Sequence, residues 1–149
     1  MLGELRHSQI DTLLISQTVG RIGCHAGGHT YVVPVTYAYD GEYIYGHTQE
    51  GKKIEMMRGN PEICMEVDDI EGRANWRSAI VWGKYEELEG TAAESALLFL
   101  EDRLMPLQRS DTALPMYGLD QAHLVKNPQT IPVVYRIKVE RKSGKFEKS

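Results

Sequence analysis

Three runs rich in apolar residues follow one another early in the chain, and turn signals separate them. The runs cover residues 19–24, 31–39 and 42–46. Gly27-Gly28 divides the first two runs, and Asp40-Gly41 divides the last two. Asp-Gly between β-rich runs is a strong hairpin signal, because both turn positions require positive φ. The pattern therefore predicts a three-stranded antiparallel meander.

Apolar residues at helical spacing predict helices over residues 8–17, over 50–58 and from Thr91 towards Pro106. Ser8–Asp11 and Thr91–Glu94 have the spacing of capping boxes. Further strands are predicted over residues 62–69, 75–88 and 131–139. Gly83 inside the longest of these strands predicts a bulge. The remaining segments read as an acidic loop (68–72), a loop with little periodicity (107–129) and a charged tail (140–149).

The pattern thus contains about six strands joined by tight turns, with a helix on each side and a short one between. Strands of this kind close most economically into a small antiparallel barrel. The predicted fold class is mainly β: a six-stranded antiparallel split β-barrel with flanking short α-helices. At 149 residues, 42% of them hydrophobic, the chain has the size of one ordinary domain, so residues 1–149 are taken as a single domain.

Charge and composition exclude several classes of protein. A net charge of −4 and a pI near 5.7 argue against a nucleic-acid partner, which requires a basic face. There is no run of about 18 apolar residues, so we expect no membrane span, and no secretory leader is visible. Cys24 and Cys64 lie in apolar runs without C-x-x-C spacing, which is typical of buried free thiols. We expect a cytoplasmic protein.

The sequence shows no motif for catalysis by side chains alone. His25 and His29 have i, i+4 spacing but flank a predicted turn, so no metal site is expected. No G-x-S-x-G motif and no glycine-rich dinucleotide fingerprint is present. Any chemistry is therefore expected to come from a cofactor.

One segment has the composition of an anion site. His47 and Thr48 end a predicted strand, and Gly51, Lys52 and Lys53 follow at the start of a predicted helix. Hydroxyl and ammonium donors at a helix N-terminus suit a phosphomonoester. The alternatives are two solvated lysines and a strand-end histidine that makes one backbone hydrogen bond.

Pro34 cannot donate a ladder hydrogen bond. The strand that contains it is therefore either an edge of the sheet at this point or has a ligand lying along it. A sheet edge without any ligand is the simpler alternative.

Taken together, these segments resemble the FMN-binding split β-barrel superfamily, and most closely its pyridoxamine 5′-phosphate oxidase-like branch, which includes the nitroimidazole-resistance flavoproteins. The resemblance covers residues 10–139. It rests on GRIGCHAGGHTYVVPVTYAYDGEYIYGHT, GKKIEMMRGNP and NWRSAIVWGKYEEL.

The resemblance implies a homodimer with two FMN sites at the subunit interface and a small-molecule substrate. Residues 33–36 match the strand whose backbone faces the isoalloxazine edge, and Lys52-Lys53 matches the family's phosphate pair. The residues placed at the cofactor in this way are Val33, Pro34, Val35, Thr36, His47, Thr48, Lys52, Lys53, Trp76, Arg77 and Ser78, the last three reaching it across the interface.

Departures from the family narrow the expected activity. Tyr31, Gly51 and Ser78 replace an arginine, a serine and a glutamine of true pyridoxamine-phosphate oxidases, and ERKSGKFEKS lacks their C-terminal arginine. We therefore expect an FMN-dependent oxidoreductase with another small organic substrate, nitroaromatic compounds being one class, and His47 as the one candidate proton donor. The alternatives are a flavin or haem binder without turnover, with His25 or His47 as haem ligand, and a similar barrel that uses a deazaflavin.

Overall fold

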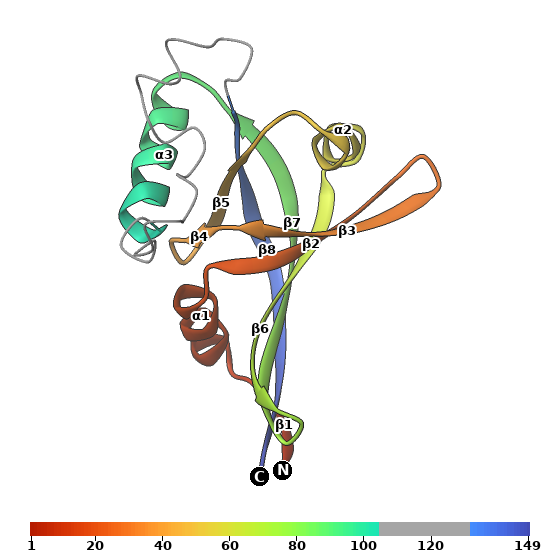
Figure 1. Cartoon of the computed structure of the whole chain (residues 1–149), viewed down its shortest axis with the longest axis vertical. Helices are drawn as coiled ribbons and strands as arrows, with labels where there is room; N and C mark the ends of the chain where they lie inside the picture. Colours follow the sequence, from red (N-terminus) through yellow and green to blue (C-terminus); the bar gives the residue numbers. More distant parts are fainter. Residues whose placement is uncertain (105–131) are drawn as a thin grey trace, which may run out of the picture.

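The computed structural model describes residues 1–104 and 132–149, which form one antiparallel sheet with helices around it (Figure 1). The helices of this part are α1 (His7–Ser16), α2 (Lys52–Gly59) and α3 (Gly90–Leu104). The strands are β1 (Leu2–Glu4), β2 (Val19–Ala26), β3 (His29–Thr36), β4 (Ala38–Tyr39), β5 (Tyr43–Thr48), β6 (Glu62–Gly72), β7 (Asn75–Leu88) and β8 (Val133–Lys148). The mainly β class is confirmed, with eight described strands where six were predicted.

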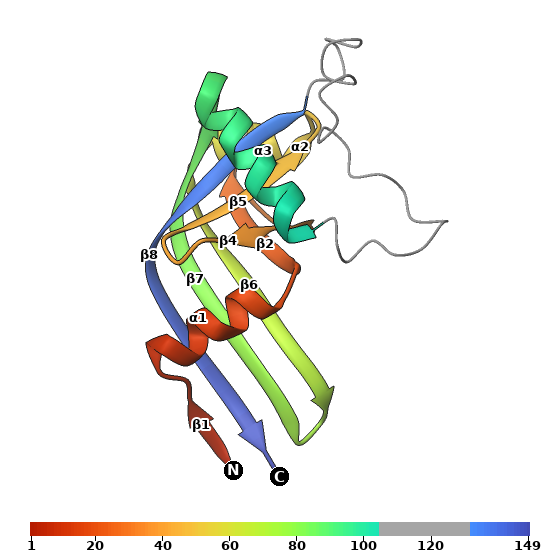
Figure 2. The ribbon, with the colours of Figure 1, turned by 90° about the vertical axis from the view of Figure 1, so that its left-hand side faces the viewer.

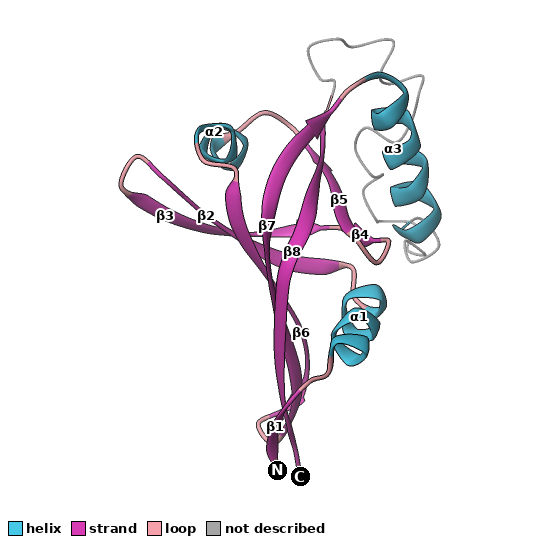
Figure 3. Ribbon diagram, turned by 180° about the vertical axis from the view of Figure 1, so that it is seen from behind, coloured by secondary structure: helices cyan, strands magenta, loops and turns pink. Residues whose placement is uncertain are grey.

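The sheet curls into a split barrel. Its order is β3-β2-β6-β7-β8-β5-β4, with β1 beside β8. β3 and β4 stand at opposite ends of this order, yet only Tyr37 separates them in the sequence. The two ends of the sheet must therefore approach each other, and Figures 1 and 3 show β3 running on into β4.

The predicted three-stranded meander is wrong, because its second run divides at Tyr37. β2 and β3 form the expected hairpin, with φ of 59° at Gly27 and 79° at Gly28. β4 and β5 form the second hairpin, but β5 pairs with β8 instead of β3.

Contacts with α1 explain the division. The Tyr37 hydroxyl donates to the carbonyl of Leu14 at 2.6 Å, and the Tyr39 hydroxyl donates to the carboxylate of Asp11 at 2.9 Å. These bonds hold the bend against α1, which lies across one face of the sheet (Figure 2).

Two segments predicted to be irregular belong to strands. The acidic residues 68–72 continue β6, where Asp69 makes an ion pair with Arg77 of β7 at 2.7 Å. The predicted charged tail continues β8, which pairs with β7 from Asn75 onward and with β1. Oppositely charged partners on the neighbouring strand offset the low strand propensity of aspartate. The strands that pair with the tail, β1 and the start of β7, are distant from it in sequence.

The bulge at Gly83 is present, but the extra residue lies in β8. Trp82 pairs with Arg141 and Gly83 with Val139, so Glu140 has no pairing partner on β7. A Cβ at position 83 would lie 2.0 Å from the carbonyl oxygen of Lys138. Glycine is therefore required for β7 and β8 to approach each other here.

The helix starts differ from the predicted capping boxes. The side chain of Gln9 accepts from the backbone N–H of Arg6 at 2.8 Å, so α1 begins one residue before Ser8. α3 begins at Gly90, which places Thr91 inside the first turn. The helix predicted over residues 50–58 is α2, and the loop predicted over 107–129 lies outside the described residues.

Burial in the core holds α2 against the barrel. Ile54 and Met57 of α2 are fully buried in the same cluster as Ile22, Met65 and Ile137 of the sheet. Because this face of α2 is anchored in the barrel, the first turn of the helix is held close to the end of β5.

Candidate functional site

Within the described residues, no side chain caps the amide groups in the first turn of α2. Gly51 precedes the helix in an extended conformation (φ 178°) and makes no side-chain capping bond. Three residues earlier β5 ends at Thr48, so the strand end and the helix start share one short connection. Uncapped N–H groups at a helix N-terminus are favourable donors for an anion.

Lys53 carries the positive charge of this region into a partly buried position. Its Nζ donates to the hydroxyl oxygen of Thr48 at 2.8 Å. Burial lowers the pKa of Lys53, which the nearby Cys24 thiol partly offsets. In the described ranges no carboxylate lies within ion-pair distance of this ammonium group. A half-buried ammonium group that bonds to one hydroxyl has further N–H donors available, and such a group fits a phosphate.

Lys52 points elsewhere. Its ammonium group is exposed and lies 5.1 Å from the centre of the Tyr31 ring on β3. The two lysines therefore diverge from the helix start, Lys53 towards β5 and Lys52 towards β3. Sequence reasoning joined them as one pair and missed Tyr31 as a cation–π partner.

His47 precedes Thr48 on β5 and is half-buried. Because side chains alternate along a strand, its ring points to the opposite face from Thr48, the face on which Tyr45 packs against Phe99 of α3. Its Nε2 is inaccessible to solvent and has no hydrogen-bond partner within residues 1–104 and 132–149. Burial lowers the pKa of His47 to about 4, so the ring is neutral at pH 7. An unsatisfied buried ring nitrogen on this face of β5 fits a hydrogen bond to a bound polar group. A neutral imidazole is a poor general acid, which weakens its predicted role as proton donor.

β3 forms an end of the sheet, which confirms that the strand with Pro34 is an edge. Val33 and Val35 turn towards the core, while Pro34 and Thr36 are exposed. In the described part of the chain β3 pairs only with β2, so its outer backbone edge has no strand beside it.

Trp76, Arg77 and Ser78 stand at the start of β7, where they pair with the C-terminal end of β8. Figure 1 shows that this end of the sheet, where both termini lie, is far from α2. The Trp76 indole N–H donates to Glu147 at 3.2 Å, and the Ser78 hydroxyl donates to Glu66 at 3.0 Å. Because side chains alternate along a strand, Arg77 points to the opposite face from both.

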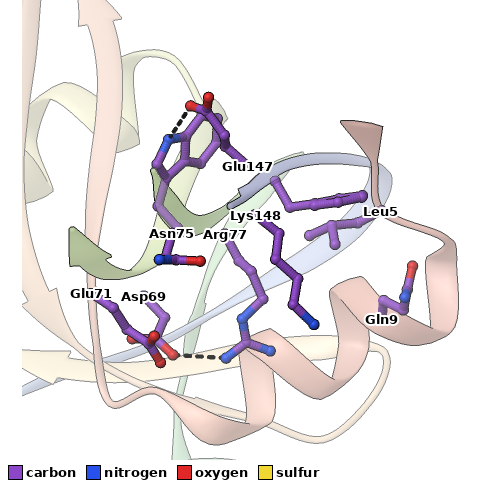
Figure 4. A pocket seen from close by; sticks show the side chains of 10 residues that line it. Leu5, Gln9, Asp69, Glu71, Asn75, Arg77, Glu147 and Lys148 are labelled. Carbon is purple, nitrogen blue, oxygen red and sulfur yellow. Dashed lines mark hydrogen bonds and ion pairs between the residues drawn. The ribbon is translucent and has the colours of Figure 1, made fainter. Parts of the chain in front are cut away.

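Arg77 lines a cavity of about 490 Å³ near α1. Figure 4 shows its guanidinium group bonded to Asp69, with Lys148 and Gln9 nearby. Opposite charges therefore meet in this cavity.

A groove of about 500 Å³ crosses the opposite face of the sheet, and all the residues that line it belong to strands. Val32, Gly23, Cys64 and Trp82 form a cross-strand row along it, each paired with the next. Val32, a member of this row, is 65% exposed. Ile80, two residues before Trp82 on the same face of β7, is 37% exposed. The sequence signal for this face was the run 31–35, which is apolar on both sides of its strand.

The described residues offer neither a metal site nor a membrane span. They contain no group of three or more histidine, cysteine or acidic side chains placed to hold a metal ion. None of the described helices has the length and apolar character needed to cross a membrane.

Comparison with known proteins places the chain in a family. The family model described as pyridoxamine 5′-phosphate oxidase matches residues 6–146. The chain belongs to the pyridoxamine 5′-phosphate oxidase family. This confirms the resemblance found in the sequence, including its split-barrel fold.

A curated member of similar sequence is an uncharacterized protein of Rhizobium meliloti (strain 1021). It is 34% identical over 73 residues, which span 49% of this chain and 48% of that protein. This chain therefore matches about half the length of that relative.

Solved structures of similar fold cover almost the whole chain. One is described as an FAD-binding protein from Mesorhizobium loti, with a TM-score of 0.75, 29% identity and coverage of 100% of this chain and 98% of that one. Another is described as a candidate 5-nitroimidazole antibiotic resistance protein from Bacteroides thetaiotaomicron. Its TM-score is 0.69 at 21% identity, and the match covers 98% of this chain and 87% of that one. The second likeness shows the fold alone.

Proposed function

We propose that this protein binds FMN at the start of α2 and uses it as an oxidoreductase for a small organic substrate, such as a nitroaromatic compound. The observation that carries the proposal is Lys53, a half-buried ammonium group bonded to the Thr48 hydroxyl. A phosphomonoester dianion supplies the counter-charge that this cation lacks among the described residues. Family membership and the FAD-binding protein from Mesorhizobium loti support a flavin.

The neighbouring residues then have distinct tasks. Thr48 and Lys53 hold the phosphate. The neutral His47, on the other face of β5, offers a ring nitrogen to a part of the cofactor beyond the phosphate. The free backbone edge of β3, over Val33, Pro34, Val35 and Thr36, lies open to the flavin edge. Bound FMN supplies hydride and electron transfer, while the protein binds and orients it.

We further propose that the active unit is a homodimer. Trp76 and Ser78 are distant from Lys53 within one chain, so they reach a flavin at α2 only if a second copy brings them there (Figure 1). The exposed Val32 and Ile80 beside a groove supply apolar surface for such a copy. The two free cysteines support a reducing compartment, and we propose the cytoplasm.

Flavin binding without turnover is the second candidate function. His47, the one side chain that the sequence offered as proton donor, is neutral at pH 7 because its burial disfavours the charged ring. This favours a protein that holds the cofactor without supplying a proton to a substrate.

Titration of the flavin-free protein with FMN, riboflavin and FAD tests the binding proposal. FMN should bind at least about 100-fold more tightly than riboflavin, because about two charge-assisted phosphate contacts at roughly 1.5–3 kcal/mol each are lost without the phosphate. Equal affinity for FMN and riboflavin would contradict a phosphate site at α2. A higher affinity for FAD would assign the site to the dinucleotide.

Anaerobic mixing of the FMN-loaded protein with NADH or NADPH separates the two candidate functions. Bleaching of the flavin band, followed by reoxidation with a nitroaromatic acceptor, supports the oxidoreductase. A flavin band that persists with both donors supports binding without turnover.

A further inference from the structure

Arg58, in the last turn of α2, connects three segments of the chain. Its guanidinium group donates to both carboxylate oxygens of Glu50, at 2.8 Å and 2.7 Å. The same group donates to the carboxylate of Glu87 near the end of β7, with one distance of 3.2 Å. The Tyr85 hydroxyl donates to Glu87 at 2.9 Å, which fixes that carboxylate in turn.

Glu50 lies in the connection that carries the candidate phosphate site, between Thr48 and Lys52. Gly51 follows it without a side-chain cap. Among the described residues, the two-pronged contact of Arg58 with Glu50 (the fork) is therefore the side-chain contact that holds this connection in place. Helical side chains lean towards the helix N-terminus, which explains how Arg58 reaches back along α2 to Glu50.

The charges of this cluster leave Arg58 no role as a direct phosphate ligand. Two carboxylates bond to the N–H edges of its guanidinium group and raise the pKa of Arg58 further above its ordinary value. The fork also keeps the negative charge of Glu50 bound to a cation. Without Arg58 this carboxylate would be free to turn towards an anion held by Lys53 and repel it.

We propose that Arg58 is a positioning residue for the phosphate site, acting through Glu50 on the connection between β5 and α2. The inference rests on the proposed function, since it concerns the phosphate of the same cofactor. Its consequence is selective: Arg58 supports the affinity for the phosphate group and leaves the affinity for the ring system unchanged.

The test compares FMN with riboflavin in Arg58→Ala, Glu50→Ala and the double variant. We expect Arg58→Ala to bind FMN about five- to tenfold more weakly, and riboflavin with less than about a twofold change. Glu50→Ala and the double variant should lose FMN affinity to a smaller and equal extent, because both lack the contact with Arg58 but neither keeps the carboxylate that repels the phosphate. An equal loss of both ligands would show a merely structural role and overturn the proposal, as would unchanged FMN binding.

Arg136 provides a matched control. It makes a similar two-pronged contact with Glu86, the neighbour of Glu87 on β7, but belongs to β8 and does not contact α2. Arg136→Ala should leave the ratio of FMN to riboflavin affinity unchanged. Should Arg58→Ala fail to fold, Glu50→Ala and Arg58→Lys give the same comparison, the latter with a partial loss because lysine makes no two-pronged contact.

The outcomes also separate this inference from the proposed function. A parent protein that binds neither flavin overturns both. A parent protein that prefers FMN, with the same preference in every variant, overturns the role of Arg58 alone.

Discussion

At the scale of single residues, the candidate site depends on neighbouring lysines with different surroundings. Lys53 is half-buried against Thr48, whereas Lys52 is exposed above the Tyr31 ring. The sequence predicted that cations at this helix start suit an anion. It could not predict their divergence, because Thr48 and Tyr31 lie on strands at different places in the sheet.

This difference predicts unequal effects of two alanine substitutions. Lys53→Ala should weaken FMN binding by at least about tenfold, because it removes a charge-assisted contact worth roughly 1.5–3 kcal/mol. Lys52→Ala should change it by less than about threefold, because an exposed charge is well screened. Isothermal titration with FMN measures both. Equal affinities of Lys53→Ala and the parent protein would remove Lys53 from the site.

His47 predicts a pH dependence of folding. Its pKa is about 4 in the folded state against an ordinary value of 6.5, so below pH 6.5 the unfolded chain takes up a proton that the folded chain refuses. Stability should therefore fall as the pH drops from 6.5 towards 4, by about 2 kcal/mol between pH 7 and pH 5.

Urea unfolding of the parent protein, His47→Asn and His7→Asn at pH 7 and pH 5 checks this expectation. His47→Asn should lose less stability over this interval than the parent protein. His7→Asn changes an exposed histidine and should behave as the parent does. The same pH dependence in all three proteins would contradict a neutral, buried His47.

At the scale of elements, the sequence predicted what local signals determine. The bounds of β7, the two glycine-containing hairpins and the helix after Gly51 follow from turn residues and periodicity. The extension of β6 to Gly72 and of β8 to Lys148 does not, because these residues are held by pairing with other strands: β6 pairs with β7 to its end, and the end of β8 pairs with the start of β7 and with β1, which are distant in sequence.

The same reason explains what was missed at the site. The contact of Arg58 with Glu50 and Glu87 joins segments that no periodicity connects. By contrast, a strand period of two predicts that Arg77 faces away from Trp76 and Ser78, so that part of the site was accessible from the sequence.

The junction of β7 and β8 predicts different costs for two glycine substitutions. Gly83→Ala should destabilise the protein by about 2 kcal/mol or more, because the new Cβ would lie 2.0 Å from a backbone oxygen. Gly72→Ala, also in a strand, meets no atom within 4 Å and should change stability by less than about 0.5 kcal/mol. Thermal unfolding of both variants measures the difference. Equal stability would contradict the close approach of the two strands.

At the scale of the whole molecule, the candidate site is incomplete in one chain. α2 lies at one end of the sheet, while Trp76 and Ser78 lie near the other (Figure 1). A second copy on the grooved face of the sheet would cover Val32 and Ile80. The homodimer is therefore the form in which the proposed flavin site has all its residues.

Sedimentation of aspartate variants tests this assembly. Val32→Asp and Ile80→Asp should convert a dimer to monomers, because each buries a charge in an apolar interface. Ile15→Asp provides the control, since Ile15 is 49% exposed on α1, at the face of the sheet opposite the groove. A monomeric parent protein, or dimers that persist in both groove variants, would contradict this interface.

The most direct test of the account is the absorption spectrum of the protein as purified, followed by that of the supernatant released on heating. We predict flavin bands in both, with the released compound identified as FMN. A colourless protein that also fails to bind added FMN would contradict the central claim, and would leave this split barrel with a function other than flavin binding.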